Sequence, residues 1–139
     1  MKKEKTIRVI YVEPGEYARV VDIGNTLQDL KNAVGGYIEV FNLKDSPDIG
    51  EICVVCNEEG KLYGLTPCRA IYGDKEEIVD VICGPFFICG SHGESFASLD
   101  EKQIEYYIEK FRYPERFSFG RDSVQAVPYD PQRDRKKER

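Results

Sequence analysis

The stretch Val34-Gly35-Gly36-Tyr37-Ile38-Glu39-Val40 joins a helical pattern directly to a strand pattern. Upstream of it, apolar side chains recur at helical spacing over residues 27–34, and either residue of Asn25-Thr26 can accept a hydrogen bond from an unpaired amide of the first turn. Gly35-Gly36 predicts the end of the helix, because glycine adopts the left-handed conformation without a Cβ clash. A strand over residues 37–43 follows, so the chain must reverse sharply at one of the two glycines.

A β-hairpin is predicted before this helix. Residues 7–12 and 19–23 are rich in Ile, Val and Tyr, and Glu13-Pro14-Gly15-Glu16 is a turn sequence between them. The opening order of hairpin, helix and strand is like the start of a ubiquitin-like β-grasp fold, and this likeness concerns the fold only.

More strands are predicted after the central stretch. Residues 52–65 read as a second hairpin, with apolar strands on either side of a turn at residues 57–60, and Pro67 ends the returning strand. Residues 78–89 contain two buried strand segments around a kink at Gly84-Pro85, where proline cannot donate a ladder hydrogen bond.

A second helix is predicted over residues 100–111. Ser98 and Glu101 stand at capping-box spacing at its start. Beyond Pro114 the pattern weakens, although residues 124–127 can add one short strand. We therefore expect an α+β fold in which a mixed, mostly antiparallel sheet has two covering helices.

Composition agrees with one domain, which we place over residues 6–131, followed by a charged mobile tail over residues 132–139. The chain has 139 residues, of which 41% are hydrophobic, and this is enough to bury a core. No apolar stretch approaches the roughly 20 residues that span a bilayer. Residues 1–5 lack the apolar core of a signal peptide, so the expected location is the cytoplasm.

The charge is distributed unevenly along the chain. Residues 6–111 carry 19 acidic and 9 basic side chains, a net charge of −10, within a total of −5 for the chain. Such an acidic body repels nucleic acid over most of its surface, so binding to nucleic acid is not expected.

The five cysteines and the one histidine do not form a recognisable reactive set. Cys53 and Cys56 have the spacing of a metal or redox pair, but on a strand they point to opposite faces, which favours buried core cysteines. His92 follows Cys89 closely, as in a nucleophile and its base, although a surface-loop histidine is the favoured interpretation. We expect no cofactor, no metal and no catalytic residue.

Four residues are the candidates for ligand binding: Tyr37, Asn57, Glu58 and Arg69. Asn57 and Glu58 begin a turn, and loops often carry function on a rigid scaffold. Arg69 stands in a nearly uncharged stretch, which favours a structural ion pair and leaves open a contact with an anionic ligand, or simple exposure. Solvated turn residues are the alternative for Asn57 and Glu58.

Three phrases together resemble a known family. They are residues 34–40 quoted above, Asn57-Glu58-Glu59-Gly60-Lys61-Leu62-Tyr63-Gly64-Leu65, and Val81-Ile82-Cys83-Gly84-Pro85-Phe86-Phe87-Ile88-Cys89-Gly90. The chain resembles, over roughly residues 7–131, a small domain of unknown function carried by phages, plasmids and the Gram-positive bacteria that host them. The resemblance implies no activity and no functional residues.

We therefore expect a non-enzymatic accessory binding protein of a phage or mobile element, with a host protein as the candidate partner and no membrane association. One alternative is an acidic DNA mimic that inhibits a host defence enzyme. The other is a small-ligand binder or enzyme that uses residues 57–69.

Overall fold

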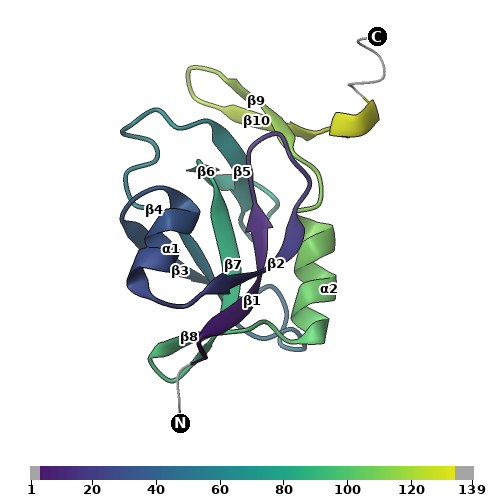
Figure 1. The fold of residues 1–139 in the computed structure, drawn as a ribbon. Helices are drawn as coiled ribbons and strands as arrows, with labels where there is room; N and C mark the ends of the chain where they lie inside the picture. Colours follow the sequence, from purple (N-terminus) through teal and green to yellow (C-terminus); the bar gives the residue numbers. More distant parts are fainter. Residues whose placement is uncertain (1–3, 134–139) are drawn as a thin grey trace.

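The structure is a computed structural model that describes residues 4–133, and its centre is a large antiparallel sheet (Figure 1). The strands of this main sheet lie in the order β2 (Arg19–Gly24), β1 (Thr6–Val12), β7 (Phe86–His92), β4 (Ile52–Asn57) and β3 (Ile38–Leu43), and β8 (Ser95–Ala97) pairs with the end of β7. Two separate hairpins are formed by β5 (Pro67–Tyr72) with β6 (Ile78–Cys83) and by β9 (Glu115–Phe119) with β10 (Val124–Pro128). The helices are α1 (Leu27–Val34) and α2 (Glu101–Lys110).

The fold is α+β and rich in sheet. Every strand pairing within residues 4–133 is antiparallel, as most were expected to be. The opening order of hairpin, helix and strand is present, but a β-grasp start is not confirmed. In the described part of the chain β1 pairs with β2 and β7, and both pairings are antiparallel.

The core consists of two apolar clusters, because successive side chains of the central strands point to opposite faces of the sheet. On one face, α1 packs Leu30 and Val34 against the sheet. On the other face, α2 contributes Tyr107, but Ile71 and Ile82 of the β5–β6 hairpin belong to the same cluster. A helix and a hairpin share this face, so the expectation of a sheet covered by two helices is not confirmed in that simple form.

The prediction of a returning strand over residues 61–65 is wrong. Residues 58–64 form consecutive turns, and the Leu65 N–H donates to the Gly60 carbonyl at 2.9 Å. Pro67 begins β5 instead of ending a strand, and β5 pairs with β6. The reason lies in β4, which is paired with β3 along one edge and with β7 along the other, so neither edge is open to a returning strand.

Both helix starts are capped, but only one as predicted. At α1, Thr26 and Asp29 form a capping box. At α2 the N-cap is Asp100, whose carboxylate accepts from the backbone N–H of Gln103 at 2.8 Å. The prediction of a Ser98–Glu101 capping box is therefore wrong. Residues 98 and 99 are still hydrogen-bonded to β1. The Leu99 N–H donates to the Arg8 carbonyl, and the Arg8 N–H donates to Ser98 Oγ. The helix cannot begin until these bonds to β1 end.

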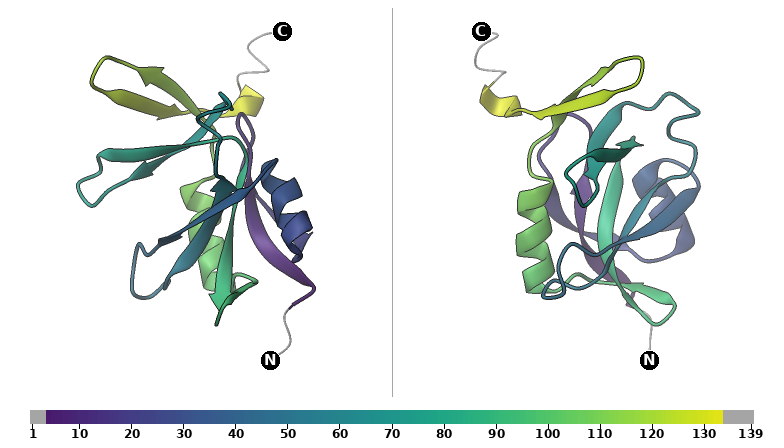
Figure 2. Two further views of the ribbon diagram at one scale, coloured as in Figure 1. Left: turned by 90° about the vertical axis from the view of Figure 1, so that its left-hand side faces the viewer. Right: turned by 180° about the vertical axis from the view of Figure 1, so that it is seen from behind.

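The β9–β10 hairpin extends away from the main sheet, on the same side as the β5–β6 hairpin (Figure 2, left). Sequence reasoning identified β10 and missed β9. The tail expected over residues 132–139 lies, from residue 134 on, outside the described residues, and the amides of Gln132 and Arg133 donate to the Asp130 carboxylate. No helix in residues 4–133 is long and apolar enough to cross a membrane.

The hydroxyl of Tyr107 should be dispensable for stability. Tyr107 is fully buried, and its hydroxyl makes no hydrogen bond of normal geometry within residues 4–133, although the Asp45 backbone is close enough to lower the Tyr107 pKa slightly against the effect of burial. Because an unpaired buried hydroxyl is unfavourable, Tyr107→Phe should leave the free energy of unfolding unchanged or raise it by up to about 1 kcal/mol in urea melts. Tyr106→Phe, which removes a hydroxyl that donates to Asp45 at 3.0 Å, is the contrasting variant. A clear loss of stability in Tyr107→Phe would show that the Tyr107 hydroxyl does make a stabilising hydrogen bond.

Candidate functional site

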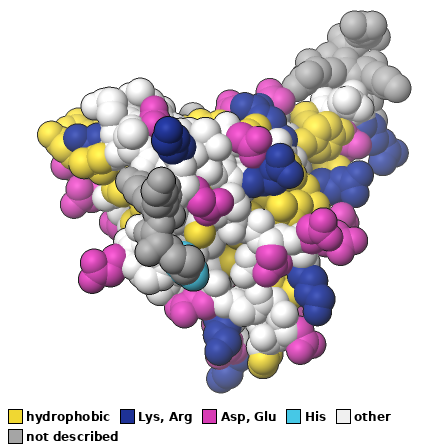
Figure 3. All heavy atoms as spheres, turned by 60° about the horizontal axis from the view of Figure 1, so that its bottom comes forward, with side chains coloured by type: hydrophobic (Ala, Val, Ile, Leu, Met, Phe, Trp, Pro, Cys, Tyr) yellow, Lys and Arg dark blue, Asp and Glu magenta, His cyan; other side chains and the backbone are white. Residues whose placement is uncertain are grey.

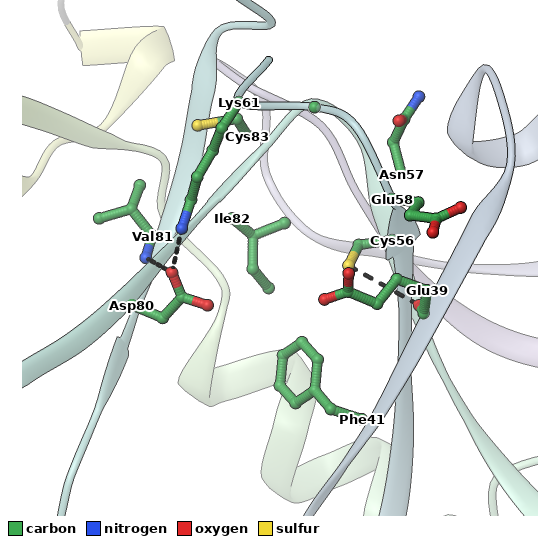
Figure 4. A pocket seen from close by; sticks show the side chains of 11 residues that line it. Glu39, Phe41, Cys56, Asn57, Glu58, Lys61, Asp80, Val81, Ile82 and Cys83 are labelled. Atoms are coloured by element: carbon green, nitrogen blue, oxygen red, sulfur yellow. Dashed lines mark hydrogen bonds and ion pairs between the residues drawn. The ribbon is translucent and has the colours of Figure 1, made fainter. Parts of the chain in front are cut away.

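A narrow cleft lies between the β3–β4 corner of the main sheet and strand β6 (Figure 4). Its volume is about 130 Å³. Its lining comes from three segments, namely β3, the end of β4 with the turn after it, and β6. The lining residues are Glu39, Phe41, Cys56, Asn57, Glu58, Gly60, Lys61, Asp80, Val81, Ile82 and Cys83.

The turn after β4 closes one end of the cleft, because it is held against β6 at two points. Gly60 approaches the Cys83 carbonyl so closely that an added Cβ would lie 2.4 Å from the oxygen, so only glycine fits there. One residue further on, the Lys61 ammonium forms an ion pair with Asp80. The turn is thereby fixed to a strand about twenty residues away in the sequence.

The charges on the cleft walls are mostly negative. The lining residues include three carboxylates, Glu39, Glu58 and Asp80, and one cation, Lys61. Asp80 accepts from Lys61 and also from the Val81 N–H at 2.8 Å. The hydrogen bond with Asp80 raises the pKa of Lys61 above its usual value, and the Asp80 and Glu39 charges act in the same direction, so Lys61 is positively charged at neutral pH.

The floor of the cleft is apolar and carries an unreactive thiol. Phe41 is half-buried, and Cys56 and Ile82 are buried. Burial raises the pKa of Cys56 to about 11, with the negative charges of Glu39 and Asp80 as further causes. Because the thiolate is the nucleophile, this protonated thiol is not suited to covalent catalysis.

Asn57 and Glu58, both predicted from the sequence, lie at the cleft, but they differ in what they can offer a ligand. The Asn57 amide is already used, since Nδ2 donates to the Val34 carbonyl at 3.2 Å and Oδ1 accepts from the Glu59 N–H at 2.8 Å. The Glu58 carboxylate is exposed and makes no hydrogen bond or ion pair with any residue of the described range. Glu58 therefore remains available, whereas Asn57 connects the end of α1 to the turn.

Tyr37 lies beside this cleft but does not line it. Its carbonyl accepts from the Glu58 N–H at 2.8 Å, while the residue is 63% exposed. The Lys31 ammonium lies 4.6 Å from the centre of the Tyr37 ring, in a separate open hollow at the end of α1. The backbone therefore joins Tyr37 to Glu58, and the side chains face different spaces.

Arg69 is remote from the other three candidates. It is only 1% exposed, and within residues 4–133 its guanidinium donates to four backbone carbonyls and forms no ion pair, in contrast to the expected ion pair. It lines a second cavity of about 290 Å³, together with Tyr72 and Glu115. Glu115 accepts from the Ala70 N–H at 2.8 Å, and its charge favours the charged form of Arg69, although burial lowers the Arg69 pKa overall.

Sequence reasoning missed Glu39, Lys61 and Asp80 of the cleft. Alternation along β3 places Glu39 and Phe41 on one face, and this signal was readable in the sequence. The contact between Lys61 and Asp80 carries no local signal, because it depends on β6 folding back over the main sheet.

The cysteines do not gather into a metal site. Cys53 belongs to the cluster under α1 and Cys56 to the opposite cluster, which confirms that the pair is split across β4. Throughout residues 4–133 no group of three or more His, Cys, Asp or Glu side chains is placed to hold a metal ion. His92 is exposed at the end of β7, whereas Cys89 is fully buried.

Comparison with known proteins shows the family of this chain. The model of a family described as a domain of unknown function (DUF3846) matches residues 7–112, well over half of the chain. No curated protein and no solved structure matches the chain.

Proposed function

We propose that this chain, which belongs to the DUF3846 family of domains of unknown function, is a non-enzymatic binding protein that acts as one domain over residues 6–131. The partner that we propose is a host protein in the cytoplasm, and the setting is a phage or another mobile element. The setting rests on the resemblance of residues 34–40, 57–65 and 81–90 to a domain found there.

The observation that supports binding is the location of exposed apolar side chains. In the described part of the chain, seven large apolar side chains are more than half exposed, and five of them lie on the two projecting hairpins and the turn after β4. These five are Leu62, Tyr63, Val79, Phe119 and Val127. Isolated exposed apolar residues are ordinary, but their concentration on projecting elements is typical of surfaces that contact another protein.

Affinity capture with surface variants tests this proposal. Immobilised protein is exposed to host lysate, and bound proteins are quantified by mass spectrometry. A partner should be retained by the wild type and by Leu27→Gln, whose side chain is 58% exposed on α1, and lost by Leu62→Gln/Val79→Thr or by Phe119→Thr. Equal capture by all four proteins would contradict binding through these elements. Turnover in an activity panel that disappears in Glu58→Gln or His92→Gln would contradict a non-enzymatic role.

A second candidate is small-ligand binding at residues 57–69, and the cleft beside Asn57 and Glu58 favours it. Tyr37 and Arg69 face other spaces, so a single small ligand would use Glu58 and not all four candidate residues.

DNA mimicry is the less favoured alternative. A mimic needs acidic groups in rows at the spacing of duplex phosphates. On the face drawn in Figure 3, acidic and basic side chains are interspersed. Mixed charges of this kind are ordinary for a solvated protein surface.

A further inference from the structure

We propose that the cleft between β3 and β6 binds a primary alkylammonium group, presented either by a lysine side chain of a partner protein or by a free diamine. This inference rests on the binding function proposed above and names the chemistry that the cleft recognises. Its basis is the size of the cleft, the position of its charges, its apolar floor and the lysine that already occupies part of it.

The size of the cleft limits the ligand to one small group. Pockets for drug-sized ligands measure about 300–1,000 Å³, whereas this cleft measures about 130 Å³. A nucleotide or a sugar is too large, but an unbranched alkyl chain with a compact head group can enter.

The charges select a cation. Glu39 on β3 and Asp80 on β6 stand on opposite walls, and Figure 4 shows the Glu39 carboxylate turned into the cleft. Glu39 has no hydrogen bond or ion pair through its carboxylate within the described residues, and neither does Glu58. The Glu39 carboxylate is therefore ready to receive a positive charge, with Glu58 at the rim of the cleft turned outward (Figure 4), while a phosphate or carboxylate ligand would be repelled.

The floor suits an alkyl chain. A lysine side chain packs its methylene groups on apolar surface and keeps its ammonium among polar groups. Phe41, below the Glu39 carboxylate, and Ile82, beside it, supply such a surface (Figure 4). Burial is the main cause of the raised pKa of Cys56 on the floor, and the negative charges of Glu39 and Asp80 raise it further.

Lys61 shows that the cleft accepts an ammonium, and it should compete with the ligand. Its ammonium is bound to Asp80 on the β6 wall, although its side chain is 64% exposed. With Lys61 in place, Asp80 is partly neutralised, and the ligand must rely mainly on Glu39. Removing the Lys61 charge should therefore strengthen ligand binding, while removing the Glu39 charge should weaken it.

The experiment is an NMR titration of the full-length protein at low salt. The probes are n-butylammonium, 1,4-diaminobutane, a blocked Gly-Lys-Gly peptide and n-butanol as the neutral control. We expect saturable amide shifts at residues 39, 41, 56–61 and 80–83 with the three amines and none with butanol. Such shifts should shrink as salt is added, because exposed charges are screened.

Three variants decide the assignment. Glu39→Gln should weaken amine binding roughly five-fold, and Lys61→Met should tighten it by a similar factor, as expected for partly exposed charge pairs. Glu105→Gln on the exposed face of α2 should have no effect. A Lys61→Met variant that binds no more tightly, or equal shifts with butanol, would overturn the proposal.

The probes also separate the two sources of the amine. Binding of the lysine peptide supports a partner's side chain, whereas binding of the free amines alone supports a small-molecule ligand. The inference can fail while the binding function stands. Suppose that the captured partner is retained equally by Glu39→Gln and the wild type, and that no amine binds. The cleft is then not the recognition site, and the partner can still bind to the two hairpins.

Discussion

Replacing Arg69 with methionine should lower the free energy of unfolding by about 3–5 kcal/mol, the largest effect that we expect from a single substitution in this chain. The guanidinium is almost fully buried, so its charge is stabilised by protein groups and not by water. Methionine fills a similar length but can donate no hydrogen bond. Buried carbonyl oxygens would be left without their donors, and each costs roughly 1–3 kcal/mol before the structure relaxes.

The geometry explains why one side chain can have so large an effect. Nε donates to the Phe111 carbonyl at 3.1 Å, and Nη2 donates to the Glu16 carbonyl at 2.7 Å. Nη1 donates to the carbonyls of Cys68, at 2.9 Å, and Glu13, at 3.5 Å. Arg69 thus connects β5 to the β1–β2 turn and to the end of α2. At Phe111 it also places a positive charge where the helix dipole is negative.

Two further variants test this account by urea melts. Arg69→Lys keeps the charge but lacks the planar, branched donor set, so it should recover only part of the lost stability. Arg8→Met is the control, because Arg8 forms an exposed ion pair with Asp22 and its loss should leave the urea midpoint nearly unchanged. If Arg69→Met melts at the same midpoint as the wild type, the four carbonyl contacts are not important for stability.

The sequence indicated that Arg69 was unusual but not how it is satisfied. A charged residue in an uncharged stretch is expected to be carried into the core with its neighbours. A buried charge then needs polar partners, because it has lost its hydration. The partners are carbonyl oxygens, which every residue possesses, so nothing in the sequence marks Glu13, Glu16 or Phe111 as contacts. The same limit applies to the cleft, where the contact between Lys61 and Asp80 depends on how β6 lies over the sheet.

Local signals predicted most of the secondary structure. Glycine placement and alternation gave the end of α1, the strands β1 to β4 and the corner between β6 and β7. These local signals failed where the hydrogen bonding of a segment to a distant strand decides its structure. Residues 61–65 are not a strand because β4 already has two neighbours, and Ser98 does not cap α2 because its neighbour Leu99 still bonds to β1.

Gly35→Val should destabilise the chain by about 1–3 kcal/mol, the second large effect that we expect. Gly35 has a φ of 79°, and its N–H donates to the Lys31 carbonyl at 2.8 Å, so it is the left-handed residue that ends α1. An added Cβ would meet no atom of residues 4–133 within 4 Å. The cost is therefore one of backbone conformation and not of steric overlap.

This origin predicts an order among substitutions at position 35. Asparagine tolerates the left-handed region better than alanine, and a β-branched residue tolerates it least. Urea melts should therefore rank Gly35→Asn above Gly35→Ala, and Gly35→Val lowest. Equal midpoints for all three would mean that the helix can end without a left-handed residue.

Gly36 should behave differently, because its constraint is steric. A Cβ there would lie 2.8 Å from Asn57 Nδ2, the atom that donates to the Val34 carbonyl. Gly36→Ala should thus cost less than Gly35→Val, and its cost should fall in an Asn57→Ala background, where the obstructing amide is gone. If the double-mutant cycle shows no coupling, the close approach of Asn57 is not what limits this position. Coupling would show that the reversal after α1 and the start of the turn at the cleft are held by the same side chain.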